Sequence, residues 1–311
     1  MSAAVGNAQI QFAPTPSQLD VAYSVCRHIA RSAAKNFYYG FAVLPRPKRN
    51  ALSAVYAFMR RCDDITDDNT LSFYERHRKL AEWLDSVHRA LAGHPTDDAL
   101  LLALTDAQRR YQIPIGLLDQ LAYGTAADLV EEPDEPQFAG PLNIRYRTFE
   151  ELRQYCYGVA SVVGLVCIRI FGYRDPAAEG LAERCGLAFQ LTNIIRDVKE
   201  DVAMRRIYFP EEDLARFGLT PNDLVVPVLD RVRPLLAFEA DRAREGYRAG
   251  EELVPMVNED SQPGLWVLIT IYHRLLETIA DRQYDVFAER VSLTLREKLT
   301  ILAKGYVKRM L

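Results

Sequence analysis

The chain has 311 residues, of which 49% are hydrophobic and 26% are charged, and its formal net charge is −4. This composition is typical of a soluble globular protein, and the length allows two domains or one large core. No stretch of the sequence carries the basic excess that nucleic-acid binding requires, which argues against nucleic acid as a partner.

The cysteines and histidines argue against disulfides and against zinc or di-iron sites. The five cysteines are odd in number and form no C-x-x-C pair, which predicts reduced thiols in a cytosolic protein. The five histidines belong to no H-E-x-x-H or E-x-x-H motif, so zinc and di-iron sites have little support. The first 20 residues lack the pattern of a signal peptide, and the longest apolar run that we identify, LWVLITIY (Leu265–Tyr272), is too short to span a membrane.

The pattern along the chain is helical almost throughout. Residues 1–16 predict a flexible tail, and residues 17–311 predict one all-α domain in which Ser17 caps the first helix. Further helices are expected over about 48–65, 72–91, 97–111 and 114–129, with breaks at proline and glycine.

The second half continues in the same way after a long interruption. Residues 130–147, rich in prolines and acids, predict a surface loop or a short hairpin. Thr148 and Glu151 form a capping box before a helix over 149–172. Another helix is expected from about Pro176 to Arg206, then a loop with short helical turns over 207–224, and two or three final helices.

The segment RRCDDITDD, residues 60–68, places like charges at the end of an apolar helix. Asp63 and Asp67 share one helix face, and Arg60 lies next to both Asp63 and Asp64. Carboxylates at a helix carboxyl end interact unfavourably with the helix dipole, which a bound cation would offset. A solvated helix end, with Arg60 neutralising the acids, is the alternative interpretation.

A second polar stripe follows later in the chain. Gln190, Asn193, Asp197 and Asp201 fall on one face of an otherwise apolar helix, which predicts a cavity lining or an exposed polar face. Paired carboxylates on two helices, without histidine or cysteine ligands, favour a hard cation such as Mg²⁺ that also binds substrate phosphate oxygens. The positive charge for a diphosphate could come from Lys35, Arg60, Arg196 and Arg206.

Four segments together resemble one family. They are KNFYYGFAVLPRPKRNALSAVYAFMRRCDDITDD, YCYGVASVVG, FQLTNIIRDVKEDVAMRRIYFP and YDVFAERVSLTLREKL, which run from about Lys35 to Lys298. In this order they resemble the squalene/phytoene synthases, the head-to-head prenyl diphosphate synthases, in particular the bacterial phytoene, presqualene diphosphate and dehydrosqualene synthases. The resemblance implies a single-domain class I isoprenoid synthase helical bundle with a central cavity.

The resemblance also implies residue roles. The implied ligands of two or three Mg²⁺ ions are Asp63, Asp64, Asp67, Asn193, Asp197 and Asp201. The implied catalytic residues are Asp63, Asp67, Tyr155, Asp197 and Asp201. The implied substrate-binding residues are Lys35, Asn36, Phe37, Arg60, Val159, Val163, Gly164, Gln190, Asn193, Arg196, Arg206, Tyr208, Arg290 and Lys298. One departure is the stretch AAKNF, where the family often has S-K-S-F, so Ala34 and Asn36 stand in place of two serines.

The implied reaction joins two molecules of farnesyl or geranylgeranyl diphosphate through a cyclopropyl diphosphate. The product would be phytoene, presqualene diphosphate, dehydrosqualene or squalene, and NADPH would be needed only for squalene. The diphosphate itself or a Tyr155–water pair could accept the proton, and the chain length would depend on residues near Val163, Cys167 and Leu187. An apolar product also predicts a cytoplasmic protein in peripheral contact with the inner face of a membrane, through a segment that the sequence does not identify.

Two other functions stay open at this stage. The same fold could carry out head-to-tail prenyl elongation or terpene cyclisation, although the second acidic motif, D-x-x-x-D, differs from the repeated D-D-x-x-D typical of elongation enzymes. A non-catalytic helical scaffold would leave both acidic faces solvated.

Overall fold

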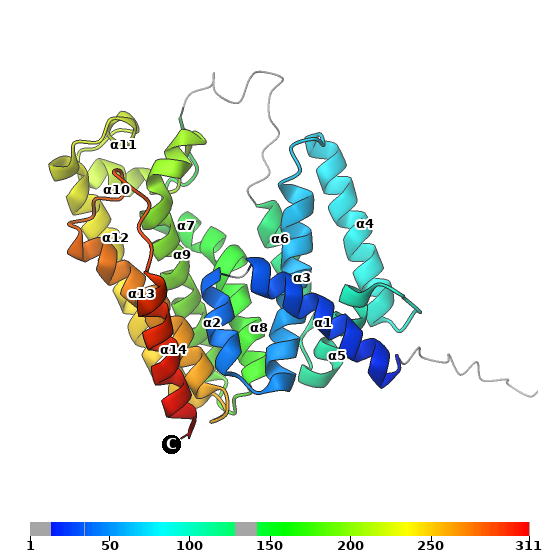
Figure 1. Ribbon diagram of the computed structural model, residues 1–311. Helices are drawn as coiled ribbons and strands as arrows, with labels where there is room; N and C mark the ends of the chain where they lie inside the picture. The colour runs from blue at the N-terminus through cyan, green and yellow to red at the C-terminus, as the bar shows by residue number, and fades with distance from the viewer. Residues whose placement is uncertain (1–13, 34, 128–141, 311) are drawn as a thin grey trace, which may run out of the picture.

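In the computed structural model, residues 14–33, 35–127 and 142–310 are described, and most of them are helical (Figure 1). The longer helices are α1 (Pro16–Ala33), α2 (Lys35–Val43), α3 (Arg46–Thr66), α4 (Phe73–Leu91), α5 (Ala99–Tyr111), α6 (Ile115–Ala126), α7 (Phe149–Cys156), α8 (Val162–Phe171), α9 (Ala177–Ala203), α12 (Leu229–Leu253), α13 (Gln262–Asp281) and α14 (Leu295–Met310). The short segments are the π-helical turn η1 (Tyr157–Ser161), α10 (Glu211–Arg216), α11 (Asn222–Val225) and the 3₁₀ turn η2 (Val254–Met256). The prediction of an all-α protein is confirmed.

Two long helices, α3 and α9, form the opposite walls of the bundle. Helix α9 packs along α12 and also contacts α8, α13 and η1, whereas α3 is surrounded by α1, α4, α5, α6 and α8. Both helices run in the same sense, and their carboxyl ends point to the end of the bundle shown at the top of Figure 1. The acidic segments that end these two helices therefore lie at the same end of the molecule.

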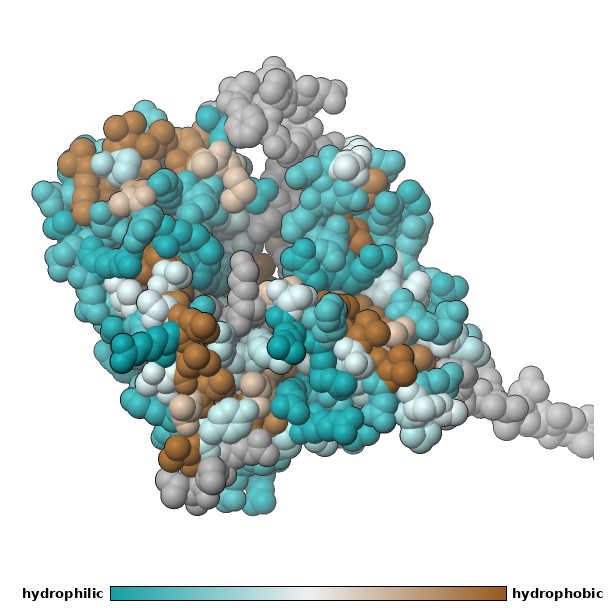
Figure 2. All heavy atoms as spheres, in the orientation of Figure 1, coloured by the Kyte–Doolittle hydropathy of each residue, from teal (hydrophilic) through white to brown (hydrophobic). Residues whose placement is uncertain are grey.

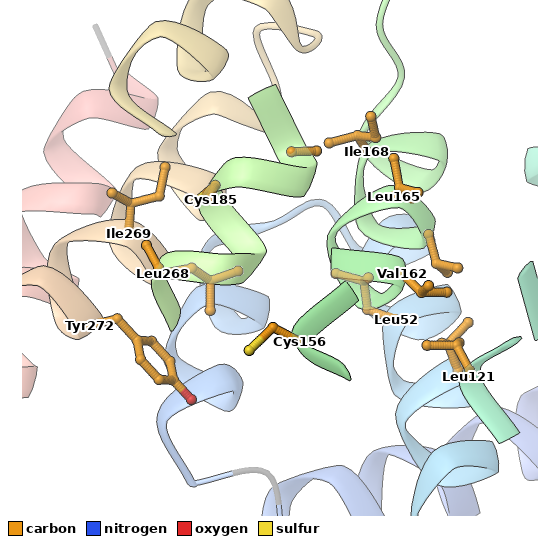
Figure 3. Packing of buried hydrophobic residues seen from close by; sticks show 14 of the residues in the cluster. Leu52, Leu121, Cys156, Val162, Leu165, Ile168, Cys185, Leu268, Ile269 and Tyr272 are labelled. Carbon is orange, nitrogen blue, oxygen red and sulfur yellow. The ribbon is translucent and has the colours of Figure 1, made fainter. Parts of the chain in front are cut away.

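A continuous hydrophobic core joins the two walls. Leu52 of α3, Ile168 of α8, Cys185 of α9 and Leu268 of α13 are all buried and come from four separate helices (Figure 3). Burying a leucine or isoleucine side chain contributes about 1.5–3 kcal/mol to folding. Because the contacts join helices that are distant in sequence, the core fixes the separation of α3 and α9.

The helix starts agree in part with the sequence prediction. The amino end of α1 is capped by Thr15 rather than Ser17: the Gln18 N–H donates to the Thr15 hydroxyl, and the Thr15 N–H donates back to the Gln18 side chain. Pro16, which needs no hydrogen-bond acceptor for its nitrogen, occupies the first helical position. Helix α1 thus begins inside the predicted tail, whose residues 1–13 lie outside the described residues.

The helix predicted over 149–172 begins as expected but is not uniformly α-helical. The Thr148 hydroxyl accepts from the Glu151 N–H, while the Glu151 carboxylate accepts from the N–H of Arg147 at 2.6 Å. After α7 the chain widens into the π-helical turn η1 before continuing as α8. Such turns are common at functional sites, and no feature of the sequence had predicted this one.

Glycines allow the neighbouring helices to approach η1. A Cβ atom on Gly124 of α6 would lie 2.5 Å from the carbonyl oxygen of Gly158, and one on Gly186 of α9 would lie 2.6 Å from the Cα atom of Ser161. Both distances are too short for a real methyl group. The backbones of α6, η1 and α9 are therefore in direct contact.

The sequence predicted a surface loop or a hairpin over residues 130–147, and the described part, residues 142–147, does not form a hairpin. Strand β1 (Asn143–Ile144) pairs in parallel with β2 (Arg206–Ile207), the segment that follows α9. Residues 128–141 of the predicted loop lie outside the described residues. The strand pair attaches the chain that precedes α7 to the end of α9, close to the second acidic motif.

One described segment, Phe149–Phe171, is long and apolar enough to cross a membrane by length and composition. The sequence analysis had named Leu265–Tyr272 as the longest apolar run, which was wrong, because the run from Tyr155 to Ile168 is longer. In the structure this segment packs inside the bundle against α3, α6 and α9. The five cysteines are free thiols, and four of them are buried.

The glycine contacts give a prediction about stability. We expect Gly186→Ala to lower the free energy of unfolding by about 1–3 kcal/mol, because the added methyl group would push α9 away from η1. Gly180→Ala is the matched control in the same helix, since no atom lies within 4 Å of its Cβ position. This control should gain about 0.5–1 kcal/mol from the better helix propensity of alanine. Urea unfolding measures both, and a stable Gly186→Ala protein would contradict the close packing.

Candidate active site

The first acidic motif ends helix α3 with two carboxylates that repel each other. Burial, together with the neighbouring carboxylate of Asp67, raises the pKa of Asp63 to about 6. The Asp67 N–H donates to the Asp63 carbonyl at 2.8 Å and closes the helix. Asp64 accepts from the Arg60 guanidinium at 2.6 Å, with both side chains about half exposed.

The second acidic motif near the end of α9 is surrounded by arginines. The Asp197 carboxylate accepts hydrogen bonds from the Nε atoms of Arg196 at 2.7 Å and Arg290 at 2.8 Å. Although burial alone would raise the pKa of Asp197, the hydrogen bonds from these two arginines lower it. Asp201, one turn further along α9, also lies within the electrostatic range of Arg290.

Between α3 and α9 lies an apolar cavity of about 160 Å³. Its wall includes, from η1, α8 and α9, the predicted residues Val159, Val163, Gly164, Gln190 and Asn193. Its other lining residues are Phe37, Phe41, Leu52, Val55, Tyr56, Met59, Ala160, Cys167, Ile168, Phe171, Ala182, Cys185, Gly186, Phe189, Leu253, Leu265, Leu268 and Tyr272. We call this the apolar cavity, and its composition suits a hydrocarbon chain.

A wider pocket of about 810 Å³ adjoins the apolar cavity. It is lined by residues 31–33, Phe37, Tyr38, Tyr39, Tyr56, Asn193, Arg196, Tyr272, Leu275, residues 290–293, Lys298 and Leu302. We call it the basic mouth, because Arg31, Arg196, Arg290 and Lys298 contribute positive charge and none of the lining residues that the structure describes is acidic. Figure 2 shows a hollow on this face between hydrophilic walls.

Four residues line both pockets and form the neck between them: Phe37, Tyr56, Asn193 and Tyr272. Tyr272 stacks on Phe189 with ring centroids 4.3 Å apart, and Phe37 lies 5.6 Å from the ring of Tyr272. Aromatic faces of this kind stabilise positive charge without offering a nucleophile.

The neck also connects the two acidic motifs. Burial raises the pKa of Tyr56, and the charges of Asp63 and Asp64 raise it further. Burial likewise raises the pKa of Tyr272 to about 12, and both Tyr56 and Asp197 lie close enough to contribute. Tyr56 is therefore within electrostatic range of Asp63 and Asp64, and Tyr272 is within range of Asp197, so the neck is close to both motifs.

The donor atoms of this region fit a magnesium ion that is shared with a substrate. Among residues 14–33, 35–127 and 142–310, no three His, Cys, Asp or Glu side chains converge into a ready-made metal cage. Asp63 with Asp67, and Asp197 with Asp201, instead offer pairs of hard oxygen ligands. Mg²⁺ typically binds one or two carboxylates and completes its shell with phosphate oxygens and water. Burial and the neighbouring Asp67 carboxylate disfavour the charged form of Asp63, and a bound divalent cation would stabilise it.

Tyr155 belongs to an aromatic group at the end of α9 rather than to the wall of the apolar cavity. Its ring centroid lies 5.4 Å from that of Tyr146 and 5.3 Å from that of Tyr208. The Arg145 guanidinium lies over the Tyr208 ring at 5.7 Å. Arg206 belongs to β2, two residues before Tyr208, and β2 pairs with β1, two residues before Tyr146.

A buried ion cluster supports the segment that follows β2. Arg242 of α12 donates to both oxygens of the Asp213 carboxylate, at 2.5 and 3.2 Å, and to Glu239 at 3.0 Å. The Arg242 guanidinium also lies 3.9 Å from the centre of the Phe149 ring at the start of α7. Helices α7, α10 and α12 thus all contact the Arg242 guanidinium. These contacts hold the chain near Tyr155 and the chain after Tyr208 in place.

The structure brings most of the predicted residues together. Phe37, Val159, Val163, Gly164, Gln190 and Asn193 line the apolar cavity, and Arg196, Arg290 and Lys298 line the basic mouth. Arg60 and Asp64 line neither pocket and form a salt bridge with each other. Cys167 lines the apolar cavity but Leu187 does not. The side chains of Lys35 and Asn36 lie outside the described residues.

The sequence analysis missed three residues of this region. Tyr56 precedes Asp63 by seven residues, so helical periodicity from the acidic motif could have identified it as part of the same face. Tyr272 and Arg31 belong to helices that are distant in sequence from both motifs, and no local signal marks them. Only the packing of α1 and α13 brings them to the neck and the basic mouth.

Comparison with known proteins is consistent with this geometry. A family model for squalene/phytoene synthase matches residues 30–297. A 15-cis-phytoene synthase from Synechococcus elongatus is 34% identical over 301 residues and covers 92% of each chain. A phytoene synthase from Mycobacterium bovis is 36% identical over 292 residues, covering 92% of this chain and 91% of the relative.

Solved structures of related enzymes have the same fold. A dehydrosqualene synthase in complex with a ligand superimposes with a TM-score of 0.79 and 27% identity, covering 94% of this chain and 97% of the other. A squalene synthase from Alicyclobacillus acidocaldarius gives a TM-score of 0.76 and 29% identity, covering 87% of this chain and 97% of the other.

The fold and its cavity define an isoprenoid synthase of the helical-bundle class. The chain belongs to the squalene/phytoene synthase family, and it is a prenyltransferase. Members of this family condense prenyl diphosphates head to head. The family, the fold class and the enzyme class predicted from the sequence are confirmed.

The raised pKa of Asp63 predicts that this residue destabilises the metal-free protein. Because its folded pKa of about 6 lies above the usual aspartate pKa of about 3.9, its stabilising contribution is present at low pH and is lost as the pH rises through 6. In EDTA at pH 8, Asp63→Asn should therefore raise the free energy of unfolding by about 1–3 kcal/mol. The gain should shrink towards zero as the pH falls to about 4.

Asp64→Asn is the matched control for this prediction. Asp64 is about half exposed and paired with Arg60, so its replacement should change stability by less than about 1 kcal/mol at either pH. A loss of stability for Asp63→Asn at pH 8 would show that the Asp63 carboxylate is already well stabilised without a metal ion.

Proposed function

We propose that the protein joins two molecules of geranylgeranyl diphosphate in a Mg²⁺-dependent reaction and releases phytoene. The observation that carries this proposal is the apolar cavity that opens through an aromatic neck into the basic mouth, with an acidic pair on each side. A prenyl diphosphate has the matching shape and polarity, with an apolar tail and an anionic head. The similarity to phytoene synthases, at 34–36% identity, favours phytoene among the products of the family.

Asp63 and Asp67 on one side, and Asp197 and Asp201 on the other, would hold magnesium, with Asn193 between them and Asp64 as a further donor. A bound magnesium ion supplies Lewis-acid stabilisation of the negative charge on a departing diphosphate. Arg196 and Arg290 now bind Asp197 and line the basic mouth, so the same guanidinium groups are in place to bind diphosphate oxygens.

Other cations of this region complete the binding of the two diphosphates. Lys298 lines the basic mouth, and Arg60 lies at the end of α3 beside the acidic motif. Arg206 is held in β2 close to Tyr208. Together these groups stabilise charge that develops on the leaving group, which is the largest catalytic contribution expected in such a site.

The apolar cavity protects the carbocation that remains. Val159, Val163 and Gly164 leave room for the prenyl chain and present no nucleophile. The faces of Phe37 and Tyr272 border the neck, where the reacting carbons would lie, and they stabilise positive charge. Exclusion of water from this region prevents simple hydrolysis of the substrate.

The proposed sequence of bonds is balanced without a reductant. C1 of one prenyl chain loses diphosphate and bonds to the C2–C3 double bond of the second chain. Loss of a proton from the resulting cation closes a cyclopropyl diphosphate, and the diphosphate or a Tyr155–water pair accepts that proton. Loss of the second diphosphate and rearrangement give a cation that loses another proton to form phytoene.

The solved relatives support a second candidate product. The two similar structures described above are a dehydrosqualene synthase and a squalene synthase, which favours a farnesyl substrate. Squalene formation would require NADPH as hydride donor, whereas dehydrosqualene would not. We further propose a cytoplasmic location, because a protein with five free thiols suits a reducing compartment.

Product analysis tests the proposal directly. The purified protein is incubated with geranylgeranyl or farnesyl diphosphate, with Mg²⁺ or EDTA and with or without NADPH, and the products are identified by mass spectrometry. We expect phytoene from geranylgeranyl diphosphate, no product in EDTA and no effect of NADPH. Squalene formed only with NADPH would contradict the proposed product, and a head-to-tail elongated diphosphate would contradict the reaction.

A further inference from the structure

The apolar cavity is closed at the end that lies furthest from the acidic motifs. On α3 and α9, which both end in an acidic motif, the lining residues furthest from that motif are Leu52 and Ala182. Ala182 precedes Asp197 by about four helical turns, or roughly 22 Å. Helix α8 packs on α9 and residues 172–176 join the two, so Phe171, the last residue of α8, lies beside the start of α9. Phe171 also lines the cavity and is fully buried.

A largely buried lysine holds the backbone at this closed end. The Lys48 ammonium, at the start of α3, donates to the Phe171 carbonyl at 2.8 Å and to the Ser261 hydroxyl at 2.8 Å. It also donates to the Asp260 carboxylate at 2.5 Å, so all three of its N–H donors are used. The Ser261 hydroxyl oxygen is itself within hydrogen-bond distance of the Phe171 carbonyl, at 3.2 Å. Only 12% of the Lys48 side chain is exposed, so water competes little for these bonds.

These contacts fix the point at which α8 ends. The last carbonyls of a helix have no partner within the helix, and a cation at that end also complements the helix dipole. The next residue, Gly172, has a φ of +77°, and a Cβ atom there would lie 2.3 Å from the Asn258 side chain. The Asn258 N–H in turn donates to the Gly172 carbonyl at 2.8 Å. The backbone of Phe171 is therefore held by α3 on one side and by the segment before α13 on the other.

We propose that Phe171 limits the length of the prenyl chain that the apolar cavity accepts, and that Lys48 is the positioning residue that keeps Phe171 in place. This inference rests on the proposed function, because it places the diphosphate in the basic mouth and the prenyl chain in the apolar cavity. A chain that enters through the neck passes Val163 and Cys167 on successive turns of α8 before it meets the Phe171 ring. Because Lys48 holds the carbonyl of Phe171, the ring cannot move aside for a chain that is one isoprene unit longer.

Binding of prenyl thiodiphosphates of increasing length tests this proposal without requiring turnover. The farnesyl, geranylgeranyl and geranylfarnesyl thiodiphosphates are titrated into the full chain with Mg²⁺ by calorimetry, and condensation of the corresponding diphosphates is measured in parallel. Phe171→Ala removes a ring of about the size of one isoprene unit, and Phe171→Leu is a milder version. Lys48→Met keeps the length of the side chain but removes its three donors, whereas Lys48→Arg keeps the charge and the donors.

Two control residues match the test residues in burial or position. Phe58 of α3 is as deeply buried as Phe171 but lines neither pocket, so Phe58→Leu reports the general effect of a smaller core residue. Arg46→Met removes an exposed cation from the same turn of α3 as Lys48, where Arg46 forms a salt bridge with Asp20. Melting temperatures show which variants are folded, and Phe171→Leu replaces Phe171→Ala if the latter is not.

We expect the wild-type protein to bind the geranylfarnesyl compound at least about tenfold more weakly than the geranylgeranyl compound. Phe171→Ala should reduce this ratio to near one, and Phe171→Leu and Lys48→Met should reduce it at least about threefold. Lys48→Arg and both controls should keep the wild-type ratio. The ratio compares two ligands of one protein, so a loss of stability alone does not change it.

An unchanged ratio in a folded Phe171 variant, or an equal change in Phe58→Leu, would overturn the length limit. An unchanged ratio in Lys48→Met would overturn the positioning role of Lys48. The proposed function fails separately: a wild-type protein that binds the thiodiphosphates with this length limit but condenses none of the diphosphates would contradict that function and still support the role of Phe171.

Discussion

The unfavourable charge of Asp63 beside Asp67 at the end of α3 is the constraint on which the rest of the site depends. Asp63 is held partly buried beside Asp67, at a helix end where the backbone dipole adds to the unfavourable charge, and its pKa is raised as a consequence. Asp197 is stabilised differently, because two arginines bind it directly. One side of the neck therefore has unbalanced negative charge, and the other has cations that can move to an anionic ligand. A diphosphate with its metal ions would satisfy both sides at once.

The scaffold explains why these side chains face one another and not solvent. Direct backbone contact at Gly124 and Gly186 holds α6, η1 and α9 at a fixed distance. The π-helical turn carries Val159 into the cavity wall, and the parallel strand pair holds the chain after α9 against the start of α7. Arg242 of α12 binds the carboxylates of Asp213 and Glu239, which holds α10 against α12. The stability of the fold and the shape of the cavity thus depend on the same contacts.

Much of this arrangement could be predicted from local sequence patterns. Helical periodicity placed Asp63 with Asp67, and Gln190 with Asn193, on common faces, and motif resemblance identified the family. The π-helical turn was missed, since YGVAS is compatible with an ordinary α-helix. Tyr272 was missed because its role follows from stacking on Phe189, a contact between distant helices. The cap of α1 was misplaced by two residues because Ser17 and Thr15 have equivalent side-chain chemistry.

A crystal structure with Mn²⁺ and a non-hydrolysable thiodiphosphate analogue of geranylgeranyl diphosphate would test the central claim most directly. The account predicts anomalous peaks for the ions between Asp63/Asp67 and Asp197/Asp201, with the diphosphate towards Arg196 and Arg290. The hydrocarbon tail should extend past Phe37 and Tyr272 into the cavity lined by Val163 and Phe189. Ions bound on an outer surface, or a tail that lies outside this cavity, would contradict the account.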